Sequence, residues 1–555
     1  MRRHARERPE AVALRFLADG EDVVTEWSYR QLIQRVSSIS RRLAEAGARG
    51  ERVILLYDSG PEYIAAFMGV LQAGGIAVPT YPPMGQRPLS RLIGIIQDAA
   101  PRFVLSTART RDTQARRVAE LSGHGALEWV ASDELPTRES YEDVPVVQDQ
   151  PLAMLQYTSG STGSPKGVMV THANLLSNCE TIARWLGPSE GRRGGMWLPL
   201  FHDMGLLGGV MQPLYSGFPL LFMDPMYFIQ RPVRWLRAIS KHRLTLSGAP
   251  NFAYELCATQ IPDDELQGLD LSCWSEAFCG AEPVRSETMQ RFAARFAPYG
   301  FRAEALSPCY GLAEATLLVA GKPAGTRLRT FVSPRQEDGG EASPEAPREL
   351  VSSGRVVHAH RVRIIDPDTL AECPPGKVGE VWVHGPSVAM GYWGREEESR
   401  QTFQATLPDG PAGYLRTGDL GLLHEGELFI SGRRKNVIII AGRNHHAEDV
   451  EQTAEAAHAQ VRKGGVAAFP VTAGNEERLV LLVELKPDGR RTEAEVAAVR
   501  EGIIQAVVAA HGVRPHDIFF GSVGAISRTT SGKLQRQTTR QAYLGGVLPA
   551  LKVAP

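Results

Sequence analysis

The stretch YRQLIQRVSSISRRLAEAGARGERVILL (29–56) decides the fold class. Apolar residues recur through its first part at alternating steps of three and four, and Gly47 stops the pattern. That period predicts an amphipathic helix with a glycine cap at its C-terminal end. The apolar series consists of Tyr29, Leu32, Val36, Ile39, Leu43 and Ala46. The apolar run at 53–56 then predicts a strand.

The alternation of helix and strand continues along the chain. Pro61 is placed to open a second helix that closes near Gly74, and IAV (76–78) predicts the next strand. Strands that alternate with helices in this way form a parallel sheet covered by helices. Similar alternation continues past residue 300. The sequence therefore predicts an α/β fold.

Near residue 435 the pattern changes to a few strands and helices, which suit an independent small α+β domain. Strands are predicted at 437–440, 466–469, 478–485 and 519–523, with a helix around 493–511. We therefore expect two domains, residues 1–433 and residues 434–555. Within the larger one, SPRQEDGGEASPEAPRE (333–349) is rich in Pro, Glu, Gly and Ser, which predicts a solvated, mobile loop without packed structure.

Composition narrows the class of protein. The 555 residues are too many for one hydrophobic core, and the 43% apolar and 22% charged content is ordinary for a soluble enzyme. A net charge of -1 gives no field that attracts nucleic acid or an anionic membrane. The six cysteines are scattered without zinc-like spacing, which indicates reduced thiols. We find no signal peptide and no apolar run long enough to span a bilayer, so we expect a cytoplasmic protein without stable membrane insertion.

The strongest local signal is QYTSGSTGSPKGVMVTH (156–172), which reads as a Gly/Ser/Thr loop between two strands. Glycines let backbone N–H groups turn toward an anion, hydroxyls add donors, and a lysine adds a point charge suited to phosphate. The residues concerned are Thr158, Ser159, Gly160, Ser161, Thr162, Gly163 and Lys166. The spacing G-x-x-G-x-x-K-G is not that of a Walker A loop. A flexible Gly/Ser turn is the alternative interpretation.

The loop resembles the signature of the adenylate-forming superfamily, which includes acyl-CoA synthetases, peptide-synthetase adenylation domains, luciferases and fatty acyl-AMP ligases. Further matches extend from WSYRQL (27–32) to SGKLQR (531–536). The resemblance implies a large N-terminal adenylation domain of several subdomains and a small mobile C-terminal domain. It also implies that the chain uses ATP to activate a carboxylic acid as its acyl-adenylate, with release of pyrophosphate.

The resemblance assigns the nucleotide and metal residues. SPCYGLAEAT (307–316) is similar to the motif in which Tyr310 packs against adenine, Gly311 lies beside it, and Glu314 holds Mg²⁺ that bridges the phosphates. FCGAEPV (278–284) resembles the loop that edges the adenine, with Gly280 and Ala281 giving close backbone approach.

Five further residues complete the implied site. In YLRTGDLG (414–421), Asp419 matches the ribose ligand, and Arg433 matches the arginine that assists there. Lys435 falls at the hinge about which the small domain rotates after adenylation. Lys533, in ISRTTSGKLQR, matches the lysine that reaches the α-phosphate and the substrate carboxylate. His202, in LPLFHDMGLLGG, resembles the histidine beside the carboxylate's entry, although alone it would be interpreted as a core histidine.

Three kinds of adenylating enzyme compete. A fatty acyl-AMP ligase passes its acyl group to the phosphopantetheine thiol of a holo acyl carrier protein in a polyketide or peptide synthase system. The alternatives are an acyl-CoA synthetase and an amino-acid adenylation domain, and Asp203 falls near the ammonium anchor of the latter. A non-enzymatic adenylate-binding regulator would be expected to lose Lys533 or Glu314, and both are present.

Three sequence features favour the fatty acyl-AMP ligase, with ATP, Mg²⁺ and a fatty acid as implied ligands. HDMGLLGG and TGDLGLLHEGELFISGRRKNVIIIAGRNHH (417–446) resemble that subfamily, and 333–349 falls where the subfamily carries an insertion. One departure is His446–Ala447, where the subfamily usually has an aromatic residue and a proline. The apolar stretch 210–228 suits an acyl tunnel or ordinary core.

Overall fold

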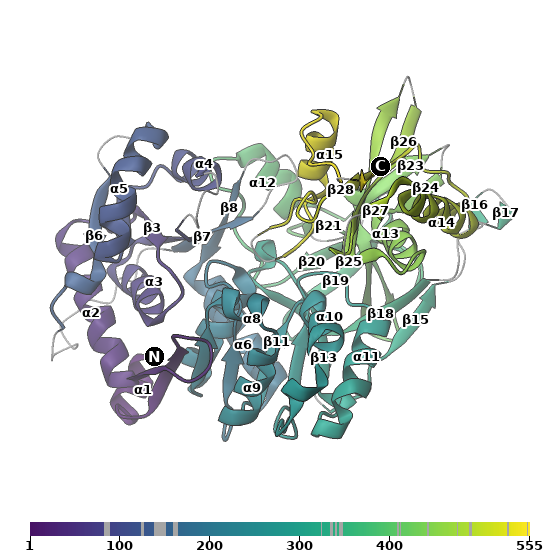
Figure 1. Cartoon of the computed structure of the whole chain (residues 1–555). Coiled ribbons are helices and arrows are strands. Elements are labelled where there is room, and N and C mark those ends of the chain that lie inside the picture. Colours follow the sequence, from purple (N-terminus) through teal and green to yellow (C-terminus); the bar gives the residue numbers. More distant parts are fainter. Residues whose placement is uncertain are drawn as a thin grey trace.

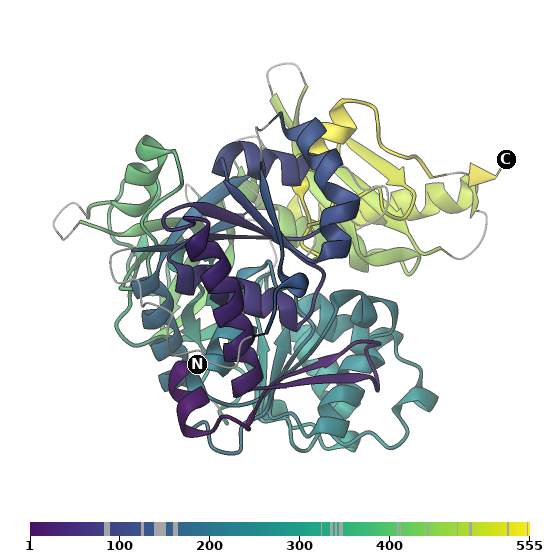
Figure 2. The same ribbon diagram turned by 90° about the vertical axis from the view of Figure 1, so that its left-hand side faces the viewer.

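The computed structural model describes the chain except residues 83–88, 124–126, 138–150, 159–164, 324, 334–336, 339–340, 343–347, 408–409, 411, 441–442, 474–475, 488–490, 530–531, 552 and 555. Figures 1 and 2 show a large part that carries most of the chain and a smaller C-terminal part, green to yellow, seated at one upper side of it. Among the helices of the described residues, none is long and apolar enough to cross a membrane.

A six-stranded sheet lies in the N-terminal region (Figure 1). Its strands, in spatial order, are β6 (Glu128–Ala131), β5 (Phe103–Ser106), β3 (Arg52–Leu56), β4 (Ile76–Thr80), β7 (Leu152–Thr158) and β8 (Lys166–Thr171). All neighbours are parallel except β7 and β8, which form the antiparallel pair on either side of the phosphate loop. The predicted parallel α/β organisation is confirmed.

Helices cover both faces of this sheet because its central strand is apolar on both sides. Val53 and Leu55 of β3 belong to the core cluster that contains α2 and α3, whereas Ile54 and Leu56 pack with α4. These helices are α2 (Tyr29–Glu45), α3 (Pro61–Ala73), α4 (Ser90–Ala99) and α5 (Ala108–Ser122). The predicted helices at 29–46 and from Pro61 to near Gly74 are present, the first with a capping box at Ser28.

A larger sheet of fourteen strands follows. In spatial order it contains β19 (Arg361–Ile365), β20 (Gly379–His384), β21 (Leu415–His424), β22 (Glu427–Arg433), β18 (Arg348–Val356), β14 (Leu318–Gly321), β13 (Leu306–Gly311), β12 (Glu276–Cys279), β11 (Leu246–Ala249), β9 (Gly194–Met196), β10 (Leu220–Met223), β1 (Val12–Leu17) and β2 (Val24–Ser28), while β15 (Thr330–Ser333) pairs with β18. From β1 through β13 the neighbours are parallel, and from β13 to β19 they are antiparallel. The sheet therefore changes from parallel to antiparallel pairing at β13.

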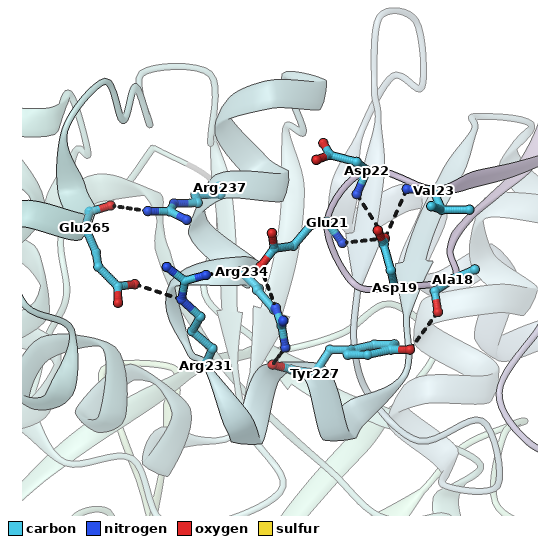
Figure 3. A network of polar contacts seen from close by, with 10 residues as sticks. All are labelled: Ala18, Asp19, Glu21, Asp22, Val23, Tyr227, Arg231, Arg234, Arg237 and Glu265. Atoms are coloured by element: carbon cyan, nitrogen blue, oxygen red, sulfur yellow. Dashed lines mark hydrogen bonds and ion pairs between the residues drawn. The ribbon is translucent and has the colours of Figure 1, made fainter.

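The loop between β1 and β2 is fixed to α8 (Pro225–Gln230) and α9 (Val233–His242) by the polar network in Figure 3. Asp19 accepts hydrogen bonds of 2.9–3.0 Å from three successive backbone N–H groups. Glu21 pairs with Arg234 at 2.8 Å, and the Tyr227 hydroxyl donates to the Ala18 carbonyl at 2.6 Å. These contacts hold the end of the sheet against its covering helices.

The C-terminal part has sheets and a core of its own. Its elements are β23 (Val437–Ile440), β24 (Arg443–His446), α13 (Ala447–Ala456), β25 (Val461–Ala473), β26 (Glu476–Leu485), β27 (Arg491–Thr492), α14 (Glu493–His511), β28 (Asp517–Gly521), α15 (Arg536–Leu544) and β29 (Val553–Ala554). A large N-terminal and a smaller α+β C-terminal domain are confirmed. The last predicted strand is displaced by two residues, because Asp517 pairs with Val480 and the strand ends at Gly521.

The loop predicted at 333–349 contains more regular structure than expected. Ser333 and Arg348 pair across β15 and β18, and β16 (Glu337–Asp338) pairs with β17 (Glu341–Ala342). The expectation of a loop is therefore wrong where these strands pair, whereas the solvation and mobility of the segment stay predictions. Much of its remainder lies outside the described residues.

Candidate functional site

One large cavity, of about 1760 Å³, gathers the predicted site residues. Those that line it are Thr158, Lys166, His202, Ala281, Tyr310, Gly311, Glu314, Asp419, Arg433, Lys435 and Lys533. Ser159, Gly160, Ser161, Thr162 and Gly163 fall outside the described residues. The lining residues come from strand ends of both large sheets and from the C-terminal domain, so the cavity lies where the domains meet.

Tyr310, Asp419 and Arg433 form a compact polar group at one wall. Asp419 on β21 lies opposite Arg433 on β22 in the register, and Arg433 Nε donates to Asp419 Oδ1 at 2.7 Å. The Tyr310 hydroxyl, at the end of β13, donates to Asp419 Oδ2 at 2.7 Å. Burial and the charge of Asp419 raise the pKa of Tyr310, so the phenol remains a donor. Asp419 in turn raises the pKa of Arg433.

Lys166 and Glu314 approach each other through Tyr392, which the sequence analysis missed. The Tyr392 hydroxyl donates to Glu314 Oε1 at 2.9 Å, and the Lys166 ammonium lies 5.3 Å from the centroid of the Tyr392 ring. Burial and the neighbouring Glu314 raise the pKa of Tyr392. The Glu314 backbone carbonyl also accepts from the Ala389 N–H at 2.9 Å. Tyr392 thus contacts both the Lys166 cation and the Glu314 carboxylate in the wall of the cavity.

Lys533 reaches the cavity from the C-terminal domain and faces the pair His202–Asp203. His202 Nδ1 lies 2.7 Å from Asp203 Oδ1, which also accepts from the Met204 N–H at 2.7 Å. Burial alone would raise the pKa of Asp203, but His202, Lys533 and the Met204 N–H lower it to about 2. Desolvation in the cavity lowers the pKa of Lys533, while Asp203 opposes that shift.

Backbone geometry explains two of the predicted glycines. A Cβ atom at Gly311 would come within 1.8 Å of the Leu317 carbonyl oxygen, and one at Gly280 within 2.9 Å of the Cys309 carbonyl oxygen. Ala281 has φ +68°, a left-handed conformation that a side chain rarely adopts. The residues predicted to edge a nucleotide therefore form a closely packed turn, in which Glu282 accepts from the Phe252 N–H at 2.6 Å.

The comparisons with known proteins identify the family. The sequence profile described as AMP-binding enzyme matches residues 1–393. The chain belongs to this family. A second profile, described as Disco-interacting protein 2-like, AMP domain, matches residues 435–553 of the AMP-binding enzyme. The predicted membership of the adenylate-forming superfamily is confirmed.

The relatives of this AMP-binding enzyme include fatty-acid ligases. It is 41% identical to the medium-chain-fatty-acid–acyl-carrier-protein ligase JamA of Moorena producens (strain JHB), over 97% of this chain and 93% of JamA. It is 36% identical to the long-chain-fatty-acid–AMP ligase FadD23 of Mycobacterium tuberculosis (strain CDC 1551 / Oshkosh), over 99% and 96%. A solved fatty acyl-adenylate ligase of L. pneumophila, in complex with acyl adenylate and pyrophosphate, matches with a TM-score of 0.75 and 37% identity, over 99% and 96%. The predicted likeness to fatty acyl-AMP ligases is confirmed.

One apolar cluster among the lining residues, called the apolar branch below, lies outside the stretch 210–228 of this AMP-binding enzyme. Of residues 210–228, which the structure describes in full, Gln212 alone lines the cavity, and most of the apolar ones are buried core. The branch is lined instead by Ile182, Trp185, Leu186, Leu246, Phe278, Leu317 and Leu318. These residues come from α6 (His172–Leu186), from β11 and β12, and from Leu317 and Leu318 at the start of β14. In the sequence each of them could equally be an ordinary core residue.

Proposed function

We propose that this enzyme uses ATP to convert a fatty acid to its acyl-AMP, releases pyrophosphate, and transfers the acyl group to the phosphopantetheine thiol of an acyl carrier protein. One observation carries the proposal: a single cavity joins the Tyr310–Asp419–Arg433 group, the Lys166–Glu314 region and an apolar branch, with Lys533 on its wall. The names of JamA and FadD23, and the acyl adenylate and pyrophosphate in the Legionella complex, support it.

The nucleoside half of ATP fits the polar wall. Asp419 can accept hydrogen bonds from both ribose hydroxyls, while Arg433 fixes the carboxylate by its 2.7 Å contact. Tyr310 would pack its ring against adenine, because its hydroxyl is already engaged with Asp419. Gly280, Ala281 and Gly311 bring backbone close to the base.

The phosphates fit the part of the cavity around Lys166 and Glu314. Thr158, the loop residues Ser159, Gly160, Ser161, Thr162 and Gly163, and Lys166 would cradle them with N–H groups, hydroxyls and an ammonium. Among the described residues no group of three or more His, Cys, Asp or Glu could hold a metal by itself. A single carboxylate such as that of Glu314 suits Mg²⁺, because this ion is commonly bound by one or two carboxylates together with substrate phosphates. The ion would neutralise the charge of the phosphates. The Tyr392 hydroxyl occupies one oxygen of Glu314 and orients the other.

We place the reaction centre near Lys533 and His202, which line the same cavity. The substrate carboxylate oxygen bonds to the α-phosphorus as the bond to the β-phosphate breaks, and pyrophosphate carries away the electron pair. Lys533 presents its ammonium where negative charge develops, and such fixed charges act without reorganisation in a shielded site. His202, held by Asp203 at 2.7 Å, would guide the entering carboxylate.

The second half-reaction requires the C-terminal domain to move. We place the boundary between residues 433 and 434 and the hinge at Lys435, in the short turn Arg434–Asn436 between β22 and β23. Rotation there would withdraw Lys533 from the acyl-adenylate and open a path for the carrier protein's thiol. The thiol then attacks the acyl carbon, and AMP leaves.

Asp203 argues against the amino-acid alternative. An ammonium anchor needs a carboxylate that can face the substrate, whereas Asp203 is engaged by His202 and the Met204 N–H and faces Lys533. The apolar branch also offers a substrate chain little but hydrocarbon contact.

A substrate panel tests the proposal. The enzyme is incubated with Mg-ATP and fatty acids of several lengths, a phenylalkanoic acid and amino acids, and the adenylates are identified by mass spectrometry. We expect acyl-AMP from fatty acids. Adenylates formed from amino acids alone would refute the assignment.

A further inference from the structure

Lys166, at the phosphate end of the cavity, already has a partner. Its ammonium pairs with the carboxylate of Glu398 on α12 (Glu396–Phe403), above the ring of Tyr392. The side chains are 12% exposed for Lys166 and 37% for Glu398. Such partly shielded pairs are screened less than exposed ones, so the contact competes with any other anion that approaches Lys166.

Glu398 has a second charged neighbour, Arg395. The Arg395 guanidinium lies 3.7 Å from the second oxygen of Glu398 and 3.8 Å from Asp98. Asp98 accepts a 2.5 Å hydrogen bond from the Tyr157 hydroxyl, and Arg395 also donates to the carbonyl of Pro165. Glu398 therefore keeps a cationic neighbour when Lys166 leaves, so the lysine is the member of the pair that can move without leaving the other unpaired.

We propose that Glu398 is an exchange partner for Lys166 that speeds the release of pyrophosphate. The Lys166 ammonium moves from the Glu398 carboxylate to the phosphate oxygens that become pyrophosphate, and Glu398 takes it back as pyrophosphate leaves. The inference rests on the proposed adenylation, because that reaction produces pyrophosphate beside Lys166. Tyr392 keeps the exchange next to Glu314, since its ring lies under the ammonium and its hydroxyl binds the Glu314 carboxylate.

The physical reason is competition for one cation. A lysine without a counter-ion would hold a multiply charged product tightly and slow its departure. The Glu398 carboxylate offers the three N–H donors of the Lys166 ammonium an alternative acceptor while pyrophosphate leaves. The other possible role is positioning, in which Glu398 orients Lys166 toward the phosphates. The two roles predict opposite changes in pyrophosphate affinity when the charge of Glu398 is removed.

The test is Glu398→Gln, which keeps the shape of the side chain and removes its charge. Calorimetric titration of the full-length enzyme with inorganic pyrophosphate and Mg²⁺ should show about two- to fivefold tighter binding than wild type, the effect expected for losing one partly exposed ion pair. KM for ATP should fall, and kcat should fall with it because pyrophosphate leaves more slowly. Weaker pyrophosphate binding with a higher KM for ATP would assign a positioning role and overturn the proposal, as would unchanged affinity.

Glu397→Gln is the matched control. Glu397 lies one residue away on the same helix, is 61% exposed, and pairs with Arg400 and Gln401 rather than with Lys166. Its pyrophosphate affinity should equal that of wild type. Glu398→Asp is the second variant: its shorter reach weakens the hold on Lys166, so its affinity should lie between wild type and Glu398→Gln, and weaker binding than wild type would contradict exchange.

The titration separates this proposal from the proposed function. A wild-type enzyme that binds pyrophosphate and shows the expected order of variants, yet makes no acyl-AMP, leaves the exchange standing and refutes the fatty-acid activation. If neither wild type nor Glu398→Gln binds pyrophosphate while acyl-AMP forms, the exchange is overturned and the proposed function stands.

Discussion

Replacing Lys533 with alanine removes a cation from the cavity wall and leaves nearby carboxylates in place. Asp203, whose pKa is lowered to about 2, is ionised at neutral pH, and Lys533 also interacts with Glu282. The substrate carboxylate would then meet negative charge with no compensating ammonium. Loss of one preorganised donor costs on the order of 10²–10³ in kcat, about 3 kcal/mol, and the uncovered Asp203 places this variant toward the upper end.

The assay separates the two half-reactions. Acyl-AMP formation from ATP and fatty acid should fall about 10³-fold in Lys533→Ala, because the cation acts in that step. Transfer from preformed acyl-AMP to a holo carrier protein should change less than about threefold, since the domain rotates Lys533 away, and surface changes seldom exceed ±0.5 kcal/mol.

Two further variants control the interpretation. Lys533→Arg keeps the charge and should retain more adenylation than alanine. Asp203→Asn in the Lys533→Ala background should recover about tenfold, because it removes the negative charge that Lys533 no longer offsets, which would be worth roughly 1.4 kcal/mol. Equal losses in both half-reactions would refute the role given to Lys533.

Three other predictions follow from the same geometry. Asp419→Asn should raise KM for ATP about 10- to 100-fold in steady-state kinetics, because charged hydrogen bonds of this kind contribute about 1.5–3 kcal/mol, and an unchanged KM would remove Asp419 from the ribose site. Ile182→Phe should shift the acid preference toward shorter chains by filling the apolar branch, at a stability cost of about 1–3 kcal/mol, and an unchanged chain-length profile would place the acyl chain elsewhere. Asp203 has a folded pKa of about 2 against 3.8. Ionised Asp203 should therefore contribute about 2 kcal/mol to the free energy of unfolding above pH 4, and this contribution should be lost as the pH falls through 2. In Asp203→Asn the free energy of unfolding should change less with pH in that window, and an unchanged pH dependence would contradict the lowered pKa of Asp203.

Local patterns predicted the fold where the sequence carried complete signals. The helix at Tyr29 has its capping residue Ser28 and an uninterrupted apolar series, and the helix at Pro61 has a proline at its start and Gly74 at its end. The strand pairing inside 333–349 was missed, because polar residues dominate the segment and its order depends on the pairing of Ser333 with Arg348. That pairing is set by the neighbouring strands rather than by the segment's composition.

The sequence predicted those site residues that lie in recognisable motifs. The motif residues that the structure describes line one cavity, except Gly280, which lies next to the lining residue Ala281. Tyr392 and Glu398 carry no local signal, because Glu398 lies 232 positions from its partner Lys166 and Tyr392 lies 78 from Glu314. The stretch 210–228 suited either an acyl tunnel or ordinary core, and most of its apolar residues are core. Residues 220–223 are apolar because β10 is buried in the sheet, and the true lining is distributed over four elements that only the fold brings together.

The most direct measurement is the intact mass of a carrier protein after reaction. Holo and apo forms of an acyl carrier protein are each incubated with the enzyme, Mg-ATP and a fatty acid, with coenzyme A present as a competing acceptor. The account predicts that the holo form gains the mass of one acyl group, the apo form gains none, and acyl-CoA is a minor product. An unmodified holo carrier protein together with abundant acyl-CoA would contradict it.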